Sequence, residues 1–115
     1  MAIDLPDAQI RCVAAAVYHE ARGESELGQR AVAHVVYTRA KKRNLTPCQV
    51  IKQPGQFCFR MRASYSGRDW NNAIRIAKIP GSDPTNGASY FHSNKVSPKW
   101  RVKYAITIGN HRFYK

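Results

Sequence analysis

The sequence predicts a mainly α-helical (α+β) fold with a few short strands, in one domain over residues 1–115. Three observations support this prediction. Apolar residues recur at helical spacing in three long stretches. Short apolar and aromatic pieces near the C-terminal end are separated by turn residues, as strands are. A chain of 115 residues is long enough for one compact domain and too short for two, so binding and chemistry must share one core.

Residues 4–22 form the first predicted helix. Asp4 can cap its N-terminus, and Pro6 suits its first turn. Its apolar positions at helical spacing are Ile10, Val13, Ala14, Val17 and Ala21. The alanine-rich middle implies close packing against another helix, and Gly23 ends the helix.

A second helix is expected over about residues 26–42, with Ser25 as its cap. One apolar stripe consists of Leu27, Ala31, Val35 and Thr38, and Val32, Val36 and Tyr37 widen it. Because both helices carry an apolar stripe and a short turn joins them, we expect them to form an antiparallel pair at the centre of the core.

The rest of the chain alternates short elements with turns. The expected elements are a short helix over 47–52 capped by Thr46, a strand or extended wall over 56–61, a third long helix from 68 or 69 to 79, an extended piece over 88–92, and two short apolar pieces within 105–114 around Gly109 and Asn110. The sequence shows no internal repeat and no linker.

The chain carries a large positive charge. Lys and Arg total 19 against seven acidic residues, which gives a formal net charge of +12. Nucleic acid, anionic lipid and the bacterial envelope are all polyanionic partners that suit such a charge. The cluster Arg39, Lys41, Lys42 and Arg43 favours a nucleic-acid-binding module, but it also suits a helix C-terminus. Dispersed charges and the lack of a recognition motif argue against nucleic acid.

The cysteines and motifs predict no metal and no cofactor. Cys12, Cys48 and Cys58 lack CxxC spacing; Cys48 and Cys58 are the pair closest in sequence, and we expect all three to be thiols in a reducing cytoplasm. P-loop, dinucleotide and GxSxG motifs are absent, and HExxH fails at Gly23. No apolar run approaches a membrane span, and the first residues show no secretory signal.

Two carboxyl groups stand near the end of the first predicted helix. While the helix continues, the four-residue spacing of Glu20 and Glu24 puts both on one face, with Arg22 nearby. Burial there disfavours a charged carboxyl and raises its pKa, as a general acid requires. The alternative is that both are solvated residues at a helix end.

The seven acidic residues narrow the search for catalytic groups. Asp4, Asp7 and Asp69 suit helix caps, and Glu26 suits the dipole of the second helix. This leaves Glu20, Glu24 and Asp83.

Aromatic and polar residues are unusually dense in the last third of the chain. The group is Asn86, Tyr90, His92, Asn110, His111, Phe113 and Tyr114. It could line a sugar-binding cleft, because aromatic faces stack on sugar rings while amides and imidazoles bond hydroxyls. The alternative, packing of a C-terminal hairpin, suits Phe113 better than Asn86 or His92.

Five stretches of the sequence carry a resemblance to a known family: EARGESELGQRAVAHVVYTR at 20–39, QF at Gln56 and Phe57, DPTNGASYF at 83–91, Trp100 after Ser97 and Pro98, and IGNHRFY at 108–114. These motifs resemble the SleB-type cell-wall hydrolase family, which contains spore-cortex-lytic enzymes and peptidoglycan hydrolases of phages and bacteria. They cover nearly the whole chain in the family's order.

The resemblance implies a lysozyme-like domain that cleaves the glycan strand of peptidoglycan, with Glu20 as catalytic acid. It implies a lytic transglycosylase that gives 1,6-anhydro products, or a two-carboxylate muramidase in which Glu24 or Asp83 is the second group. The expected secondary, substrate-binding residues are Glu24, Gln56, Phe57, Asp83, Asn86, Tyr90, His92 and His111.

The same resemblance suggests partners and a place of action. We expect a monomer that binds peptidoglycan strands and meets the anionic envelope through its positive charge. Without a visible signal peptide or wall-binding domain, the chain resembles a phage endolysin made in the cytoplasm. Such an enzyme reaches the periplasmic face of the wall with the help of a holin. An inactive wall-binding module of the same fold is a further alternative.

Overall fold

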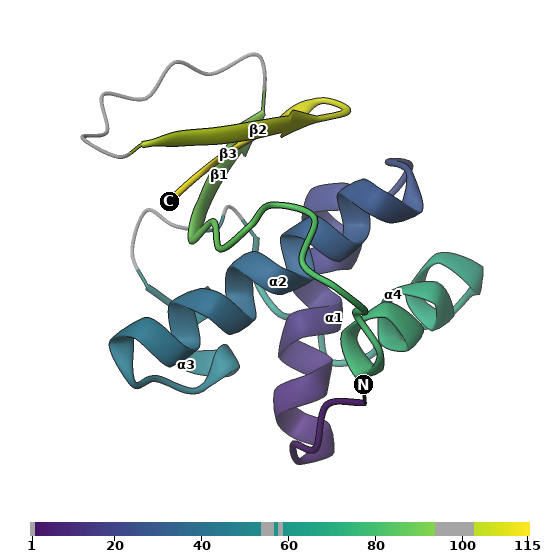
Figure 1. The fold of residues 1–115 in the computed structure, drawn as a ribbon. Coiled ribbons are helices and arrows are strands. Elements are labelled where there is room, and N and C mark those ends of the chain that lie inside the picture. Colours follow the sequence, from purple (N-terminus) through teal and green to yellow (C-terminus); the bar gives the residue numbers. More distant parts are fainter. Residues whose placement is uncertain (1, 54–56, 58, 94–102) are drawn as a thin grey trace.

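A computed structural model of the chain describes residues 2–53, 57, 59–93 and 103–115. Its elements are the helices α1 (Asp7–Ala21), α2 (Glu26–Arg43), α3 (Pro47–Ile51) and α4 (Arg68–Lys78), and the strands β1 (Tyr90–Ser93), β2 (Tyr104–Ile108) and β3 (His111–Tyr114). The predicted mainly helical domain with short strands is thus confirmed, with the helices grouped below a small sheet (Figure 1). Within the described part, none of the helices is long and apolar enough to cross a membrane.

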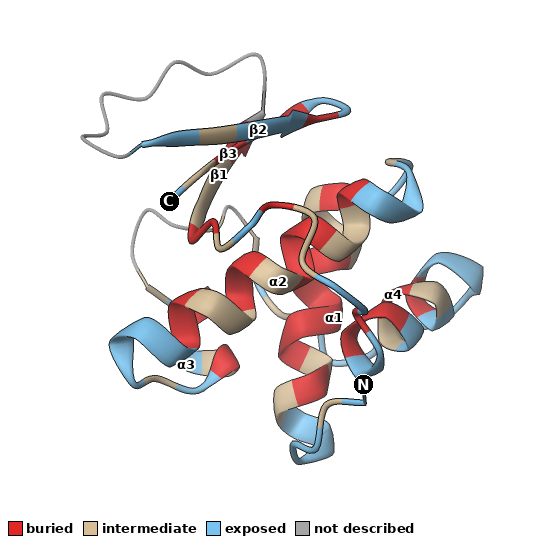
Figure 2. Ribbon diagram, in the orientation of Figure 1, coloured by how far each residue is buried: buried red, intermediate tan, exposed pale blue. Residues whose placement is uncertain are grey.

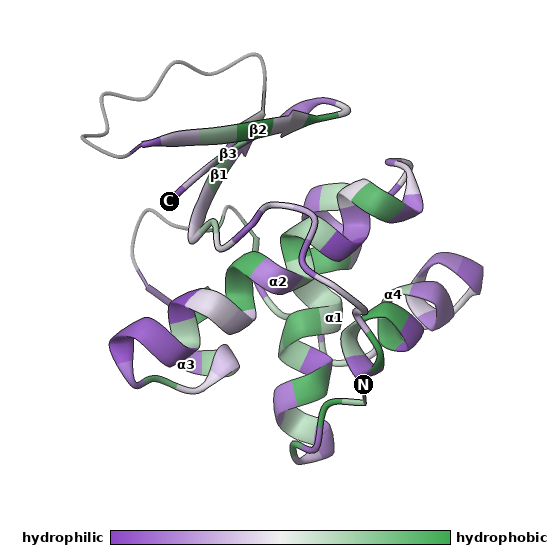
Figure 3. Ribbon diagram, in the orientation of Figure 1, coloured by the Kyte–Doolittle hydropathy of each residue, from purple (hydrophilic) through white to green (hydrophobic). Residues whose placement is uncertain are grey.

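Helix α1 lies at the centre of the helical layer. It contacts α2, α3 and α4, and its middle is buried almost completely around the helix (Figure 2). Ala14, Ala15 and Ala16 are all fully buried, which is unusual for three successive helical positions because they point in different directions. Small side chains let neighbouring helices approach on each side, and hydrophobic segments of α1, α2 and α4 lie where these helices meet (Figure 3).

Helix α2 begins at the predicted cap, where the Ser25 hydroxyl accepts a hydrogen bond from the backbone N–H of Gly28 at 3.2 Å. It ends at Arg43, and the next residue, Asn44, adopts the left-handed conformation and donates its N–H to the last turn. In Figure 1 α2 runs against the direction of α1 overall but crosses it, instead of lying along it as expected. The expected stripe is wrong at Leu27, which is 46% exposed.

The helix starts show which predicted caps form. At α3, the Thr46 hydroxyl and the Gln49 side chain each bond the other's backbone N–H, which makes the capping box. The predicted aspartate caps are wrong: α1 starts after Pro6 and α4 after Gly67, and neither start has a side-chain cap bond. Asp7 and Asp69 instead lie within the first turns, where a negative charge suits the helix dipole.

The three strands form an antiparallel sheet in the order β1–β3–β2. The β2–β3 hairpin turns at Gly109 and Asn110, as predicted, and Gly109 has φ +58°. The sheet packs against α2, and Phe113 of the central strand is fully buried in the shared core. The last strand is therefore held between the other two and brings the hairpin turn to the helical layer.

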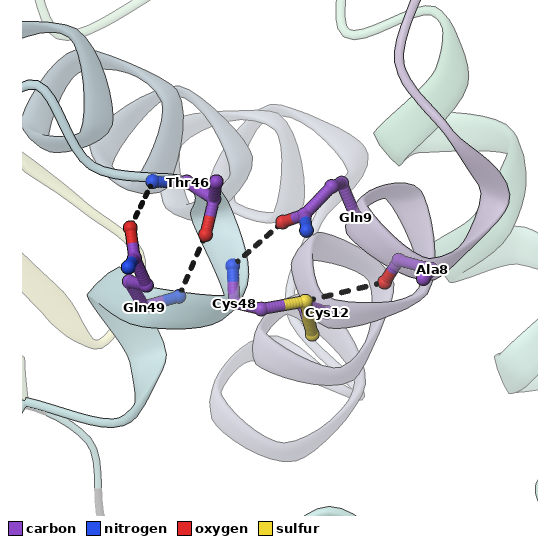
Figure 4. The surroundings of a disulfide bond; sticks show 6 residues. All are labelled: Ala8, Gln9, Cys12, Thr46, Cys48 and Gln49. Carbon is purple, nitrogen blue, oxygen red and sulfur yellow. Dashed lines mark hydrogen bonds between the residues drawn. A yellow bond between two sulfur atoms is a disulfide. The ribbon is translucent and has the colours of Figure 1, made fainter.

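The cysteine prediction is wrong, because Cys12 and Cys48 form a disulfide (Figure 4). The bond joins α1 to the start of α3 across 36 residues of sequence. Gln9 on α1 reinforces the same contact by accepting a hydrogen bond from the backbone N–H of Cys48 at 3.0 Å. Sequence proximity favoured the pair Cys48 and Cys58, but the packing of α3 on α1 decides the partner; Cys58 lies outside the described residues.

The disulfide gives a first prediction. Cys48→Ser should lower the free energy of unfolding by about 3 to 4 kcal/mol, because the cross-link no longer restricts a loop of this length in the unfolded chain. Urea unfolding with and without reductant measures the effect. Cys58→Ser is the control and should still lose stability on reduction, whereas Cys48→Ser should not. Three titratable thiols in the unreduced, denatured wild-type chain would contradict the bond.

Candidate active site

Glu20 lies in the last turn of α1 and is half-buried. The helix ends at Ala21, and Gly23 reverses the chain with φ +89°. The expectation that Glu20 and Glu24 share a helical face is therefore wrong, because the helix does not continue to Glu24. The turn carries Glu24 toward the start of α2 and leaves Glu20 as the acidic residue of α1's last turn.

Aromatic rings pack on the residue before Glu20. The His19 ring stacks on Phe59 with centroids 4.5 Å apart, and its Nε2 is 2.8 Å from the Tyr65 hydroxyl. Burial lowers the pKa of His19, and the positive charges of Arg62 and Arg22 lower it further. His19 thus joins the end of α1 to the segment around residue 59.

The sheet reaches the same turn of α1 through His111. This residue begins β3 and is buried, and its ring hydrogen-bonds the backbone of Glu20. Burial lowers the pKa of His111, against the opposing effects of the Glu24 charge and of the bond to Glu20. The C-terminal hairpin is therefore in direct contact with the residue expected to be the catalytic acid.

A continuous series of rings connects these two contacts, and we call it the aromatic arc. Its members in order are His19, Phe59, Phe57, Phe91 and His111, with successive centroids 4.5, 6.1, 5.8 and 5.4 Å apart. The arc begins on the residue before Glu20 and returns to the backbone of Glu20 itself. Phe57 and Phe59 also line a hollow of about 560 Å³ together with residues of 51–53, Arg60 and Met61.

Glu24 holds the hairpin turn. One carboxylate oxygen accepts the backbone N–H of Asn110 at 2.9 Å, and the other accepts the Asn110 side-chain N–H at 3.0 Å. These bonds lower the pKa of Glu24, the backbone bond most. His111 Nδ1 lies 3.7 Å from the same carboxylate. Arg22, which was expected near the two carboxylates, donates instead to the Tyr18 hydroxyl at 2.6 Å.

Asp83 is committed to a loop. Its carboxylate accepts the backbone N–H and the hydroxyl of Thr85, at 2.8 and 2.7 Å, and the backbone N–H of Gly87 at 2.9 Å. Burial would raise the pKa of Asp83, but these hydrogen bonds outweigh it and leave the pKa lowered. The charged carboxylate thus folds residues 83–87 into a compact turn.

The other predicted binding residues lie apart from this turn of α1. Phe91 of β1 belongs to the aromatic arc. Because side chains alternate along a strand, its neighbours Tyr90 and His92 point to the opposite face of the strand. Tyr90 accepts a hydrogen bond from Arg43, and His92 bonds Tyr114. Asn86 is exposed beside Lys103 and Tyr104.

The structure therefore brings Glu20, Glu24 and His111 together around one turn of α1, and Phe57 is linked to this turn through Phe59 and Phe91; Gln56 lies outside the described residues. Sequence reasoning did not select His19 or Phe59. The alternation of Phe57 and Phe59 was the sequence signal that could have selected Phe59. Its stacking partner, His19, lies 40 residues earlier in the chain, so the sequence did not show the contact. Among the described residues, no cluster of His, Cys, Asp and Glu could hold a metal ion.

Comparisons with known proteins agree with this arrangement. Residues 23–114 match the family model described as Cell Wall Hydrolase. The chain is 35% identical over 120 residues to the spore cortex-lytic enzyme of Bacillus cereus; the match covers 92% of this chain and only 44% of that protein.

Two solved structures have the same fold. The catalytic domain of the germination-specific lytic transglycosylase SleB from Bacillus anthracis matches with a TM-score of 0.79 at 30% identity, over all of both chains. The catalytic domain of the Bacillus cereus SleB protein matches with a TM-score of 0.72 at 28% identity, over 96% of this chain and 91% of that one. This likeness identifies the sheet and helical core as one known catalytic fold.

The role of Asp83 gives a second prediction. Asp83→Asn should lower the free energy of unfolding by about 1 to 2 kcal/mol at neutral pH, because a half-buried acceptor is lost. A carboxylate with a lowered pKa stabilises the fold above its ordinary pKa and loses this effect as the pH falls. The deficit should therefore shrink as the pH falls below about 4, the ordinary pKa of aspartate. Urea unfolding at neutral pH and below that pH tests this, and a fully stable variant at neutral pH would contradict it.

Proposed function

Since this chain belongs to the cell wall hydrolase family, we propose that it is a lytic transglycosylase of peptidoglycan, with Glu20 as its acid and base. It cleaves between N-acetylmuramic acid and N-acetylglucosamine. The observation that carries the proposal is the division of labour among the three candidate carboxyl groups. Glu24 and Asp83 each hold backbone N–H groups of a turn, whereas Glu20 stands in the turn of α1 where the two ends of the aromatic arc meet.

The reaction needs one carboxyl group that works twice. Protonated Glu20 gives its proton to the glycosidic oxygen as the bond to C1 of N-acetylmuramic acid breaks. The C6 hydroxyl of the same sugar then attacks C1, and its proton passes to the Glu20 carboxylate. The products are a 1,6-anhydro sugar and a strand with a free 4-hydroxyl, and Glu20 is again protonated.

A hydrolytic muramidase would need a second carboxyl group, either as a nucleophile about 5 to 5.5 Å from the acid or as a base about 6.5 to 9.5 Å away. Glu24 is the candidate that adjoins the site, but both of its oxygens are engaged by Asn110. Intramolecular attack by the C6 hydroxyl replaces the activated water through proximity. This favours the transglycosylase over the hydrolase.

The aromatic arc has the chemistry to position a sugar. Phe57 and Phe59 are half-buried and border the adjoining hollow, so part of each ring is available to stack on a pyranose face. The remaining proposed substrate-binding residues are Gln56, Tyr90, His92, Asn86 and Asp83. We propose that Asn86 and Asp83 contact the glycan strand farther from the cleaved bond.

The partner and the place of action follow from the substrate. The +12 charge suits attraction to the anionic bacterial envelope, and Lys41, Lys42 and Arg43 expose that charge at the end of α2. The relatives are Bacillus spore enzymes and give no support to the predicted phage endolysin, which stays a prediction together with holin-assisted release. Because the chain spans 44% of the curated relative, the activity of that whole protein is not transferred.

The assignment of Glu20 gives a third prediction. Glu20→Gln should abolish the lysis of purified sacculi, because the amide keeps the size of the side chain but has no transferable proton. Turbidity loss measures the activity, and thermal unfolding shows that the variant is folded. Glu26→Gln, which removes the exposed carboxylate paired with Arg75, is the matched control and should lyse as the wild type does. Normal lysis by folded Glu20→Gln would remove Glu20 from the mechanism.

The product gives a fourth prediction. Mass spectrometry of digested sacculi should show anhydro-muropeptides, each lighter by one water than the hydrolysed form, because the C6 hydroxyl rather than water attacks C1. A reducing-end assay on the same digest should detect no new reducing N-acetylmuramic acid. If reducing sugars dominate, the protein is a two-carboxylate muramidase instead.

A further inference from the structure

We propose that Glu24 and Asn110 form a clamp that positions the catalytic acid through His111, so that Glu24 acts on the reaction without touching the substrate. This inference rests on the proposed function of Glu20. It assigns the second glutamate of the EARGE motif a positioning role in place of the role of a second reacting carboxylate.

The clamp joins three separate parts of the fold. Glu24 lies between the end of α1 and the start of α2, and its carboxylate takes both N–H groups of Asn110 at the tip of the β2–β3 hairpin, 86 residues later in the chain. The backbone oxygen of Glu24 accepts the Gln29 side-chain N–H at 2.9 Å. Glu24 is thereby fixed at both its main chain and its side chain, as a positioning residue must be.

The packing around the clamp leaves it little freedom. A Cβ at Gly109 would overlap a Glu24 carboxylate oxygen, and the positive φ of Gly109 independently favours glycine. A Cβ at Gly28 would lie 3.3 Å from Glu24 Cβ and 3.7 Å from Ile108. Glycine at both positions therefore lets the hairpin tip approach the carboxylate closely.

His111 transmits this position to Glu20. It follows Asn110 directly, is buried, and hydrogen-bonds the backbone of Glu20. Its Nδ1 faces the Glu24 carboxylate at 3.7 Å without a hydrogen-bond partner, so the ring is oriented between the two glutamates. A shift of the hairpin tip would move His111 and with it the last turn of α1. A misplacement of about 1 Å at a reacting group can cost about 100-fold in rate.

Reversal of the hydrogen-bond polarity tests the clamp. Asn110→Asp places a carboxylate against Glu24, so we expect kcat on sacculi to fall about tenfold or more, with KM little changed. Adding Glu24→Gln supplies an amide donor for the new carboxylate at position 110 and should restore kcat to within about threefold, because the two side chains exchange roles across the same contact. The anhydro product should be unchanged in both variants.

A matched control separates this exchange from a general effect of charge. Glu26→Gln removes a carboxylate two residues along the chain, and it should not rescue Asn110→Asp. All rates are compared well below the unfolding temperature of each variant. His111→Phe keeps an aromatic ring but loses the bond to Glu20 and should also lower kcat, whereas His111→Gln, which keeps an N–H donor, should retain more of it.

Three results would overturn the proposal. The first is an unimpaired kcat in folded Asn110→Asp, and the second is rescue of that variant by Glu26→Gln. The third is a double variant, Asn110→Asp with Glu24→Gln, that regains stability but stays inactive, which would mean that Glu24 itself takes part in the reaction. NMR separates this proposal from the proposed function. The backbone amides of residues 20–23 should shift in Asn110→Asp and return in the double variant, whatever the wild-type enzyme does to sacculi.

Discussion

The burial of α1 among the other helices is the constraint on which the rest of the structure depends. A helix whose middle is apolar on every side must be surrounded there, and the run of buried alanines allows α2, α3 and α4 to approach it closely. Larger side chains at Ala14, Ala15 or Ala16 would force these neighbours apart. Both ends of α1 leave this enclosure, and Glu20 lies half-buried in the last turn. The packing that buries the helix thus also decides which of its residues can meet a substrate.

Local signals made the helices and the hairpin predictable. The Ser25 cap, the Thr46 cap and the Gly109–Asn110 turn are each determined by a few neighbouring residues, and the structure confirms them. Several of the failures depended on distant partners. Periodicity does not report how elements pack against one another. Packing decides the link between Cys12 and Cys48, the exposure of Leu27 and the bond between Glu24 and Asn110. Glu20 was selected by elimination and by resemblance, whereas its aromatic surroundings emerged only from the fold.

The excess of basic residues changes how this fold uses arginine. With seven acidic residues for 19 basic ones, most arginines need other acceptors. Arg39 is buried and donates two hydrogen bonds to the backbone oxygen of Ser89, while Arg30 binds the backbone oxygens of Pro80 and Ser82. These bonds fasten loops to α2 without any carboxylate. A protein built in this way keeps its positive surface for an anionic partner and still uses guanidinium groups as internal supports.

The place of β3 in the centre of the sheet has a consequence for the order of folding. The pairing of α1 with α2 closes a short loop, but the clamp joins residues 86 apart and needs β1, β2 and β3 to be paired. Contacts of such high sequence separation form slowly, because the chain must lose much entropy before they gain energy. We therefore expect the clamp to form late in folding. Activity would then appear later than helical structure during refolding, with docking of the hairpin as the final step.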